Sequence, residues 1–368
     1  MSTEPLNRLN LHPTGDAGLC TVSARCGGCP LIDDDPTEQR RRKLAEVASA
    51  FGEVGVRLPA EPKWVSSPQS IGYRNRVRLR IQPTGTVAFF NEVKSGGCAV
   101  LETALAELVH ETIYLSESEP EHFRPYQHLE ARGCDADGRA SLYLTLREGS
   151  QSNLVAIRRR LPDVIVADSN CSPRPVQRYE TTPGVHMSVP LDCFLQINQA
   201  VNRTLVEQVV GKALELGANS FADIYCGSGN LALPLMAAGL TGVGVDHEGP
   251  AIQSLASAFG PHGSRAIAGD AVTVSQQLVK EGQLYDLVLL DPPRAGVPHG
   301  LREMAQLSRQ AMAMCSCNPK TLARDLRQLS GEFQLESLTV FDMFPHTRHV
   351  EVMAWLRRKP QGTTAAQS

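Results

Sequence analysis

The stretch SFADIYCGSGN, residues 220–230, decides the fold, because it reads as an apolar strand that runs into a glycine-rich turn. Residues 199–217 before it and 231–239 after it have helical patterns. Further apolar strands are expected at 242–246, 285–291 and 310–317. This alternation predicts an α/β domain whose mostly parallel sheet is covered by helices on both faces.

The N-terminal half has a different pattern. Short strands are expected at 73–82, 86–93 and 141–148, a hairpin turn at 135–138 (DADG), and a helix at 38–51 with Leu44, Val47, Ala48 and Phe51 on one face. We therefore expect a small α+β domain before the α/β domain. The predicted divisions are a cysteine segment at 1–35, the small domain at 36–190, the α/β domain at 191–358 and a disordered tail at 359–368.

Composition limits the class of protein. The chain has 368 residues, 42% hydrophobic and 20% charged, which suits two or three packed domains. No apolar run approaches the roughly 18 residues of a membrane span, and the N-terminus lacks the pattern of a secretory signal. We expect a soluble, cytoplasmic protein. Its net charge of −3 argues weakly against nonspecific nucleic-acid binding, and its ten cysteines favour metal or catalytic chemistry over disulfides.

The glycine-rich turn indicates a nucleoside-containing ligand. Gly227 and Gly229 would let the backbone approach a ligand, and Asp246 ends the next strand, where it could accept hydrogen bonds from ribose hydroxyls. The third glycine of a dinucleotide site is missing, so S-adenosylmethionine fits better than a pyrophosphate cofactor. The alternative is that these glycines only turn the strand into a helix.

Reactive side chains are expected at the same edge of the sheet. Asp291 of DPPRAG and a cysteine of CSCNP (315–319) end neighbouring strands, and Glu351 opens a final strand. A thiolate near arginines and a helix N-terminus would have a lowered pKa. A nucleophilic cysteine paired with a general base suits methylation of a pyrimidine carbon. The alternatives are an inert core cysteine and an ordinary surface glutamate.

Two further patterns point to a metal and to RNA. Cys20, Cys26 and Cys29 form a C-x5-C-x2-C cluster whose fourth thiol would be Cys98 or Cys134, and such ligands admit zinc or an iron–sulfur cluster. In residues 74–80 arginines occupy every second position, so one strand face would carry Arg74, Arg76, Arg78 and Arg80. This face could meet phosphates, or it could be a solvated face with acidic cross-strand partners.

Together these motifs resemble the RNA (uracil-5-)-methyltransferase family. CxxxxxCGGC, GYRNRVR, CFLQIN, DIYCGSGN, DPPRAG, SCNP and HVE follow one another in the family's order over nearly the whole chain. The resemblance implies a class I (Rossmann-like) S-adenosylmethionine-dependent methyltransferase domain with Cys317 as nucleophile and Glu351 as proton-abstracting base. It also implies cofactor contacts from Gln196, Tyr225, Asn230, Asp246 and Asp291, with Asp270 as a weaker candidate near the adenine.

The resemblance also refines the partners. Members with the cysteine segment are similar to the 23S ribosomal RNA enzymes and carry a 4Fe–4S cluster, which implies Cys98 as the ligand that joins Cys20, Cys26 and Cys29. Only nineteen residues precede Cys20, so we expect no N-terminal RNA-binding barrel. The expected function is methylation of carbon 5 of a 23S rRNA uridine by a monomer. The alternatives are a tRNA uridine as substrate and a noncatalytic metal-containing RNA-binding protein.

Overall fold

The largest layer of the protein is an eight-stranded sheet. The structure, a computed structural model, describes residues 19–20, 22–89, 91, 97–260 and 263–360. The strand order is β1-β14-β15-β13-β12-β9-β10-β11, with β15 antiparallel to both neighbours and every other pair parallel. The strands are β1 (Lys63–Val65), β9 (Ser220–Ile224), β10 (Thr241–Asp246), β11 (Arg265–Ala268), β12 (Tyr285–Leu290), β13 (Ser308–Ser316), β14 (Phe333–Phe341) and β15 (Glu351–Arg358). This sheet confirms the predicted α/β fold.

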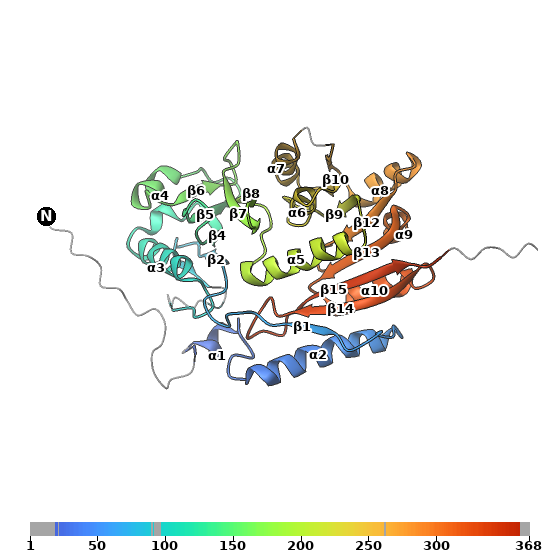
Figure 1. The fold of residues 1–368 in the computed structure, drawn as a ribbon. Coiled ribbons are helices and arrows are strands. Elements are labelled where there is room, and N and C mark those ends of the chain that lie inside the picture. Colours follow the sequence, from blue (N-terminus) through green and yellow to red (C-terminus); the bar gives the residue numbers. More distant parts are fainter. Residues whose placement is uncertain (1–18, 21, 90, 92–96, 261–262, 361–368) are drawn as a thin grey trace, which may run out of the picture.

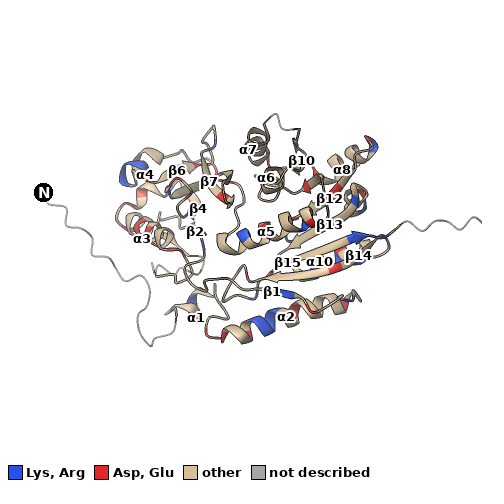
Figure 2. Cartoon of the chain, in the orientation of Figure 1, with Lys and Arg blue, Asp and Glu red and all other residues tan. Residues whose placement is uncertain are grey.

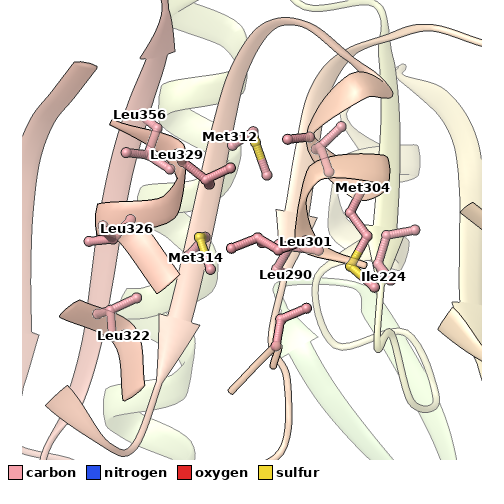
Figure 3. Packing of buried hydrophobic residues seen from close by; sticks show 14 of the residues in the cluster. Ile224, Leu290, Leu301, Met304, Met312, Met314, Leu322, Leu326, Leu329 and Leu356 are labelled. Carbon is pink, nitrogen blue, oxygen red and sulfur yellow. The ribbon is translucent and has the colours of Figure 1, made fainter. Parts of the chain in front are cut away.

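Helices cover both faces of this sheet, as Figure 1 shows. Alternate strand residues face opposite sides, so Ala222 and Ile224 enter one core while Phe221 enters the other. The first core is closed by α2 (Pro36–Glu53), α8 (Ala271–Lys280), α9 (Leu301–Gln306) and α10 (Pro319–Leu329). Figure 3 shows its packing. The second core is closed by α5 (Gln199–Glu215), α6 (Ala232–Ala237) and α7 (Gly249–Phe259).

A smaller domain has its own sheet and core. Its sheet has the order β3-β2-β4-β5-β6. The elements are β2 (Arg76–Ile81), β3 (Val87–Ala88), α3 (Thr103–Ser118), η1 (Pro120–His122), β4 (Tyr126–Arg132), β5 (Ser141–Leu146), α4 (Leu154–Arg160) and β6 (Ile165–Asp168). Strands β4 and β5 pair antiparallel around residues 135–138, which confirms the predicted hairpin. Of the expected strand 86–93, residues 90, 92 and 93 lie outside the described residues.

The division of the chain between the two domains differs from the expected boundary at residue 36. Helix α2 packs Val47, Ala50 and Phe51 into the first core of the large sheet, and β1 pairs with β14 at its edge. Ala48, expected on the buried face of this helix, is exposed. The hairpin of β7 (Val176–Thr182) and β8 (Val185–Pro190) also packs into the second core of that sheet. The small domain proper therefore begins after β1 and ends before β7.

The described part of the chain contains no helix that is both long enough and apolar enough to span a membrane. The short helix α1 (Ser23–Cys26) precedes α2, and it carries one of the clustered cysteines. Of the predicted cysteine segment at 1–35, residues 1–18 and 21 lie outside the described residues, as do residues 361–368 of the predicted tail at 359–368.

Candidate active site

The predicted reactive residues meet at one edge of the large sheet. Tyr225, Asp291 and Cys317 each directly follow a parallel strand, β9, β12 and β13, and Asp246 is the last residue of β10. The carboxyl ends of parallel strands lie at the same edge, where open α/β sheets bind ligands. Glu351 reaches that edge from the other direction, because β15 is antiparallel and begins there.

Cys317 and Glu351 are neighbours across two paired strands. The last registered pair between β13 and β15 is Ser316 with Val352. One position further out, the antiparallel register brings Cys317 beside Glu351. The Asn318 side chain caps α10 by accepting a hydrogen bond from the Lys320 N–H at 3.1 Å, so the chain turns into a helix immediately after Cys317. The thiol is thus fixed between a strand end and a helix start.

The electrostatics of Cys317 differ from the expectation. The thiol is half-buried, and burial, together with the nearby Glu351 and Asp291 carboxylates, raises its pKa from 9.0 to about 11. Arg294 acts in the opposite direction and lowers the pKa. The predicted thiolate of lowered pKa is therefore wrong for the free protein, because desolvation and two carboxylates outweigh one arginine.

Three carboxylates lie close together behind the thiol. Burial and the neighbouring Asp291 raise the pKa of Glu351 well above its ordinary value, and burial raises that of Asp291 to about 6. Asp223, within β9, is also buried, and Asp291 and Asp246 add to the rise of its pKa. The Glu351 Oε1 atom and both Asp223 carboxylate oxygens accept no hydrogen bond of normal geometry from a described residue. Such uncompensated carboxylates favour a cationic ligand or a proton.

The glycine-rich turn leaves room for a ligand at Gly227 but not at Gly229. A Cβ atom at Gly227 would meet nothing within 4 Å, whereas one at Gly229 would lie 2.6 Å from the Leu255 Cδ1 atom. The Gly227 N–H donates to the Asp246 carboxylate at 2.9 Å, which ties the turn to the end of β10. Tyr225 has a φ of 69°, a strained conformation common at functional sites.

The remaining predicted cofactor residues are Gln196, Asn230 and Asp270. Gln196 is buried in the segment before α5, and its backbone oxygen accepts a hydrogen bond from the Asn75 side chain at 3.1 Å. Asn230 exchanges two side-chain hydrogen bonds with Asn202 of α5, at 2.8 and 2.9 Å. Asp270 caps α8 through the Thr273 N–H. Their roles toward a cofactor stay predictions.

Four cysteines line a second, apolar pocket. It is formed by Cys20, Cys26, Cys29 and Cys98 with Val22, Ile32, Phe89 and Val100. Burial and the three other thiols raise the pKa of Cys29 to about 12, so the four sulfurs lie within electrostatic reach of one another. Cys134 is exposed and lies beside Glu102 instead. Among the described residues no group of His, Cys, Asp or Glu has the arrangement of a single-ion metal site.

The arginine-rich strand is only partly an open basic face. Arg76, Arg78 and Arg80 alternate with buried residues along β2, so they share a face as predicted. Arg76 is half-buried between Glu130 and the Phe194 ring, and Arg78 pairs in register with Glu130. Arg74 lies before β2, where its charge lowers the pKa of Cys29. The acidic cross-strand partner is thus present beside Arg76 and Arg78.

Sequence reasoning missed Asp223 and Lys43. Asp223 is a charged residue inside the otherwise apolar strand FADI, which is a signal that could have marked it. Lys43 is buried in α2, where its ammonium group lies 2.6 Å from the Asp342 carboxylate. No local pattern identifies Lys43, because its partner is almost 300 residues away.

A mostly parallel sheet with one antiparallel strand, and a glycine turn open to a ligand at the end of β9, are the features of an α/β S-adenosylmethionine-dependent methyltransferase fold. Residues 276–359 match the family described as tRNA (Uracil-5-)-methyltransferase. The 23S rRNA (uracil(1939)-C(5))-methyltransferase RlmD of Aeromonas hydrophila is 31% identical over 93% of this chain and 82% of its own length. The chain therefore belongs to the RNA (uracil-5-)-methyltransferase family and is an S-adenosylmethionine-dependent enzyme of that family.

Two further comparisons agree with this assignment. The RlmD enzyme of Chromohalobacter salexigens is 28% identical over 98% of this chain and 80% of its own length. The solved structure of Pyrococcus abyssi tRNA (uracil-54, C5)-methyltransferase in complex with S-adenosyl-L-homocysteine has a TM-score of 0.69 at 21% identity. The alignment covers 89% of this chain and 85% of that one, and it shows a shared fold.

Proposed function

We propose that this enzyme methylates carbon 5 of a specific uridine in 23S ribosomal RNA through a covalent adduct with Cys317. The observation that carries the proposal is the adjacency of Cys317 and Glu351 at the edge where β12 and β13 end. The printed names of the relatives in Aeromonas hydrophila and Chromohalobacter salexigens support 23S rRNA as the substrate.

The chain's own residues divide the reaction between them. The Cys317 sulfur adds to carbon 6 of the uracil ring, which makes carbon 5 an enolate carbon able to accept the methyl group. The Glu351 carboxylate then takes the proton from carbon 5, and the ring expels the Cys317 thiolate. Because the Cys317 pKa is about 11 in the free protein, the thiol must first lose its proton, and the Asp291 and Glu351 carboxylates are close to it.

The site fits a cationic nucleoside cofactor. When bound, S-adenosylmethionine supplies an electrophilic methyl group. Asp246 would hold the ribose hydroxyls, and the open space at Gly227 would admit the nucleoside. Asp223 and Asp291 are carboxylates of raised pKa that a nearby positive charge would stabilise in their ionised form.

RNA would dock on the exposed face of β2 in the small domain. Arg78 and Arg80 are exposed there, and burial together with the charges of these two arginines and of Arg147 lowers the pKa of His128 on β4. The exposed guanidinium groups of Arg78 and Arg80 would meet phosphates. Figure 2 shows further basic residues along α2 and at the end of α4.

We assign the cysteine pocket to a 4Fe–4S cluster held by Cys20, Cys26, Cys29 and Cys98. The fit rests on the donor set, since four thiols in an apolar pocket are the ligands that such clusters use. Brown protein with about four iron and four sulfide per chain after anaerobic purification is the expected result. Colourless protein that carries a single zinc ion would contradict this assignment.

The substrate is tested by offering 23S rRNA and tRNA transcripts in parallel with radiolabelled cofactor. We expect label in 23S rRNA only, at one uridine located by nucleotide mapping. The Cys317→Ala variant should transfer no label while it binds the cofactor as tightly as the unchanged enzyme. Labelling of tRNA alone would move the substrate to tRNA, and unaltered activity of Cys317→Ala would exclude the covalent route.

A further inference from the structure

The segment 342–350 connects β14 to β15 and delivers Glu351 to the active-site edge. It contains no helix or strand of its own. Its conformation includes His346 with a φ of 65°, which is uncommon for a residue other than glycine and needs support from neighbours. The position of the Glu351 carboxylate therefore depends on what holds this segment.

Helix α2 holds the segment through two buried polar side chains. The Lys43 ammonium group is 1% exposed, lies 2.6 Å from the Asp342 carboxylate, and donates to the Phe344 backbone oxygen at 3.0 Å. The Gln39 side chain accepts a hydrogen bond from the His346 N–H at 3.0 Å and lies 3.3 Å from the His346 Nδ1 atom. These contacts bind both backbone and side-chain atoms of the segment.

Residues next to the cysteine pocket also bond to segment 342–350. The Tyr73 hydroxyl donates to the Pro345 backbone oxygen at 3.1 Å, and the Leu31 N–H donates to the His346 oxygen at 2.9 Å. Tyr73 itself is buried in a small apolar cluster with Val100 and Ile197, against which Cys29, Cys98 and Phe344 pack. The cysteine pocket is thus a direct neighbour of the segment that carries Glu351, although the sequence placed it in another domain.

We propose that Gln39, Lys43 and Tyr73 are positioning residues that hold segment 342–350 and thereby set where the Glu351 carboxylate lies. This inference rests on the proposed role of Glu351 as the base. The Lys43 ammonium group and the Gln39 side chain are buried and bond to this segment, and the Gln39 amide also donates to the Asp34 backbone oxygen at 2.9 Å, so they fix the segment against the start of α2. Through Tyr73, the packing of the cysteine pocket acts on the same segment.

The test uses Tyr73→Phe, which removes one hydroxyl and keeps the ring in its apolar cluster. A displaced base slows proton removal, the last step before Cys317 is released. We expect turnover to fall by roughly 10- to 100-fold, because about 1 Å of misplacement can cost about 10²-fold. The covalent protein–RNA adduct should accumulate on denaturing gels, while the affinities for cofactor and RNA stay unchanged. A residue needed only for folding would not shift enzyme into the adduct.

Two reference variants separate the possible failures. Tyr126→Phe also removes a buried tyrosine hydroxyl, but one that contacts Asp168 and Asn153 in the small domain, so it should accumulate no adduct. Glu351→Gln should accumulate adduct by removing the base itself. Adduct in Glu351→Gln but none in Tyr73→Phe would overturn the positioning inference alone. No adduct in Glu351→Gln would overturn the proposed base.

Lys43 provides an independent check. Lys43→Met removes the charge that Asp342 faces, whereas Lys43→Arg keeps it. We expect Lys43→Met to accumulate adduct and Lys43→Arg to restore most of the turnover. Equal turnover in the two variants, in protein that is equally folded, would contradict a positioning role for the ion pair. If Lys43→Met does not fold, the Tyr73→Phe result decides.

Discussion

The reactivity of the Cys317 thiol depends on its pKa, which burial and the neighbouring charges determine. Burial and two carboxylates raise its pKa, and Arg294 and a backbone hydrogen bond at Cys317 oppose them. The free enzyme should therefore hold Cys317 mostly as the unreactive thiol near neutral pH, which protects a nucleophile that lacks its substrate. The positive charge of a bound S-adenosylmethionine would act in the other direction, because it favours the thiolate.

We predict that alkylation of Cys317 in the free enzyme becomes faster up to about pH 11, by about tenfold for each pH unit, because only the thiolate reacts. Arg294→Gln should slow alkylation and Glu351→Gln should speed it, since they remove opposite charges. Mass spectrometry of the peptide that contains Cys317 measures the rate. A rate that is already constant near pH 7 would instead indicate a thiol of low pKa.

The motifs around these residues predicted which side chains meet at the sheet edge, but not their charge states. Cys317 and Asp291 follow predicted strands, so their shared edge could be read from the sequence. The pKa of Cys317 could not, because it depends on burial and on Glu351 from a later strand. The charge of Asp223 inside an apolar strand could be seen in the sequence, but only the structure shows that its carboxylate is buried near Asp246 and Asp291.

The turn after β9 contains two glycines whose surroundings differ. Gly227 borders open space and Gly229 packs against Leu255 and Leu233. We predict that Gly229→Ala lowers the free energy of unfolding by about 1–3 kcal/mol through overpacking and strain. Gly227→Ala should cost about 1 kcal/mol of strain and chiefly weaken cofactor binding, because its methyl group enters the ligand's space.

Thermal unfolding and calorimetric titration with cofactor measure these two effects. The Gly229→Ala variant that still folds should bind the cofactor more tightly than Gly227→Ala does. The opposite order, with Gly227→Ala binding normally, would mean that the open space at Gly227 is not where the cofactor lies.

A half-buried carboxylic acid, Glu102, lies at the N-cap position of helix α3. Burial raises the pKa of Glu102 from 4.5 to about 7. Between these values the folded protein holds a proton that the unfolded chain releases, so the free energy of unfolding falls as pH rises through about 7. We predict that Glu102→Gln removes this pH dependence and raises the free energy of unfolding at about pH 8 by about 1–3 kcal/mol.

Denaturant unfolding of both proteins at several pH values measures this difference. The two proteins should be similar in stability about one pH unit below 4.5, where Glu102 is protonated in both states. A stability gap that does not change with pH would show that Glu102 keeps an ordinary pKa.

For the whole molecule, the predicted alternation of strands and helices gave the large sheet and both of its helical layers. Local patterns could not assign α2 and β1 to that sheet, because β1 pairs with β14 far along the chain. The same holds for Lys43 and for the contact between the cysteine pocket and segment 342–350. These contacts between distant parts of the chain connect the cysteine pocket and α2 to the segment that leads to Glu351.

RNA docking on the small domain should depend on salt. We predict that Arg78→Ala and Arg80→Ala each weaken RNA binding and reduce the slope of log affinity against log salt by about 0.7–0.9, the amount for one phosphate contact. Arg302→Ala, an exposed arginine on α9, serves as the control and should leave the slope unchanged. Filter binding at several salt concentrations gives the slopes, and equal slopes in all variants would place the RNA elsewhere.

The most direct test of the central claim is the identity of the atom that bonds to RNA. The Glu351→Gln enzyme is mixed with cofactor and a 23S rRNA fragment, denatured, digested and analysed by mass spectrometry. We predict one cross-linked peptide, in which a methylated uridine is bonded to the sulfur of Cys317. Methylated RNA without any such peptide, or a uridine attached to a different cysteine, would contradict it.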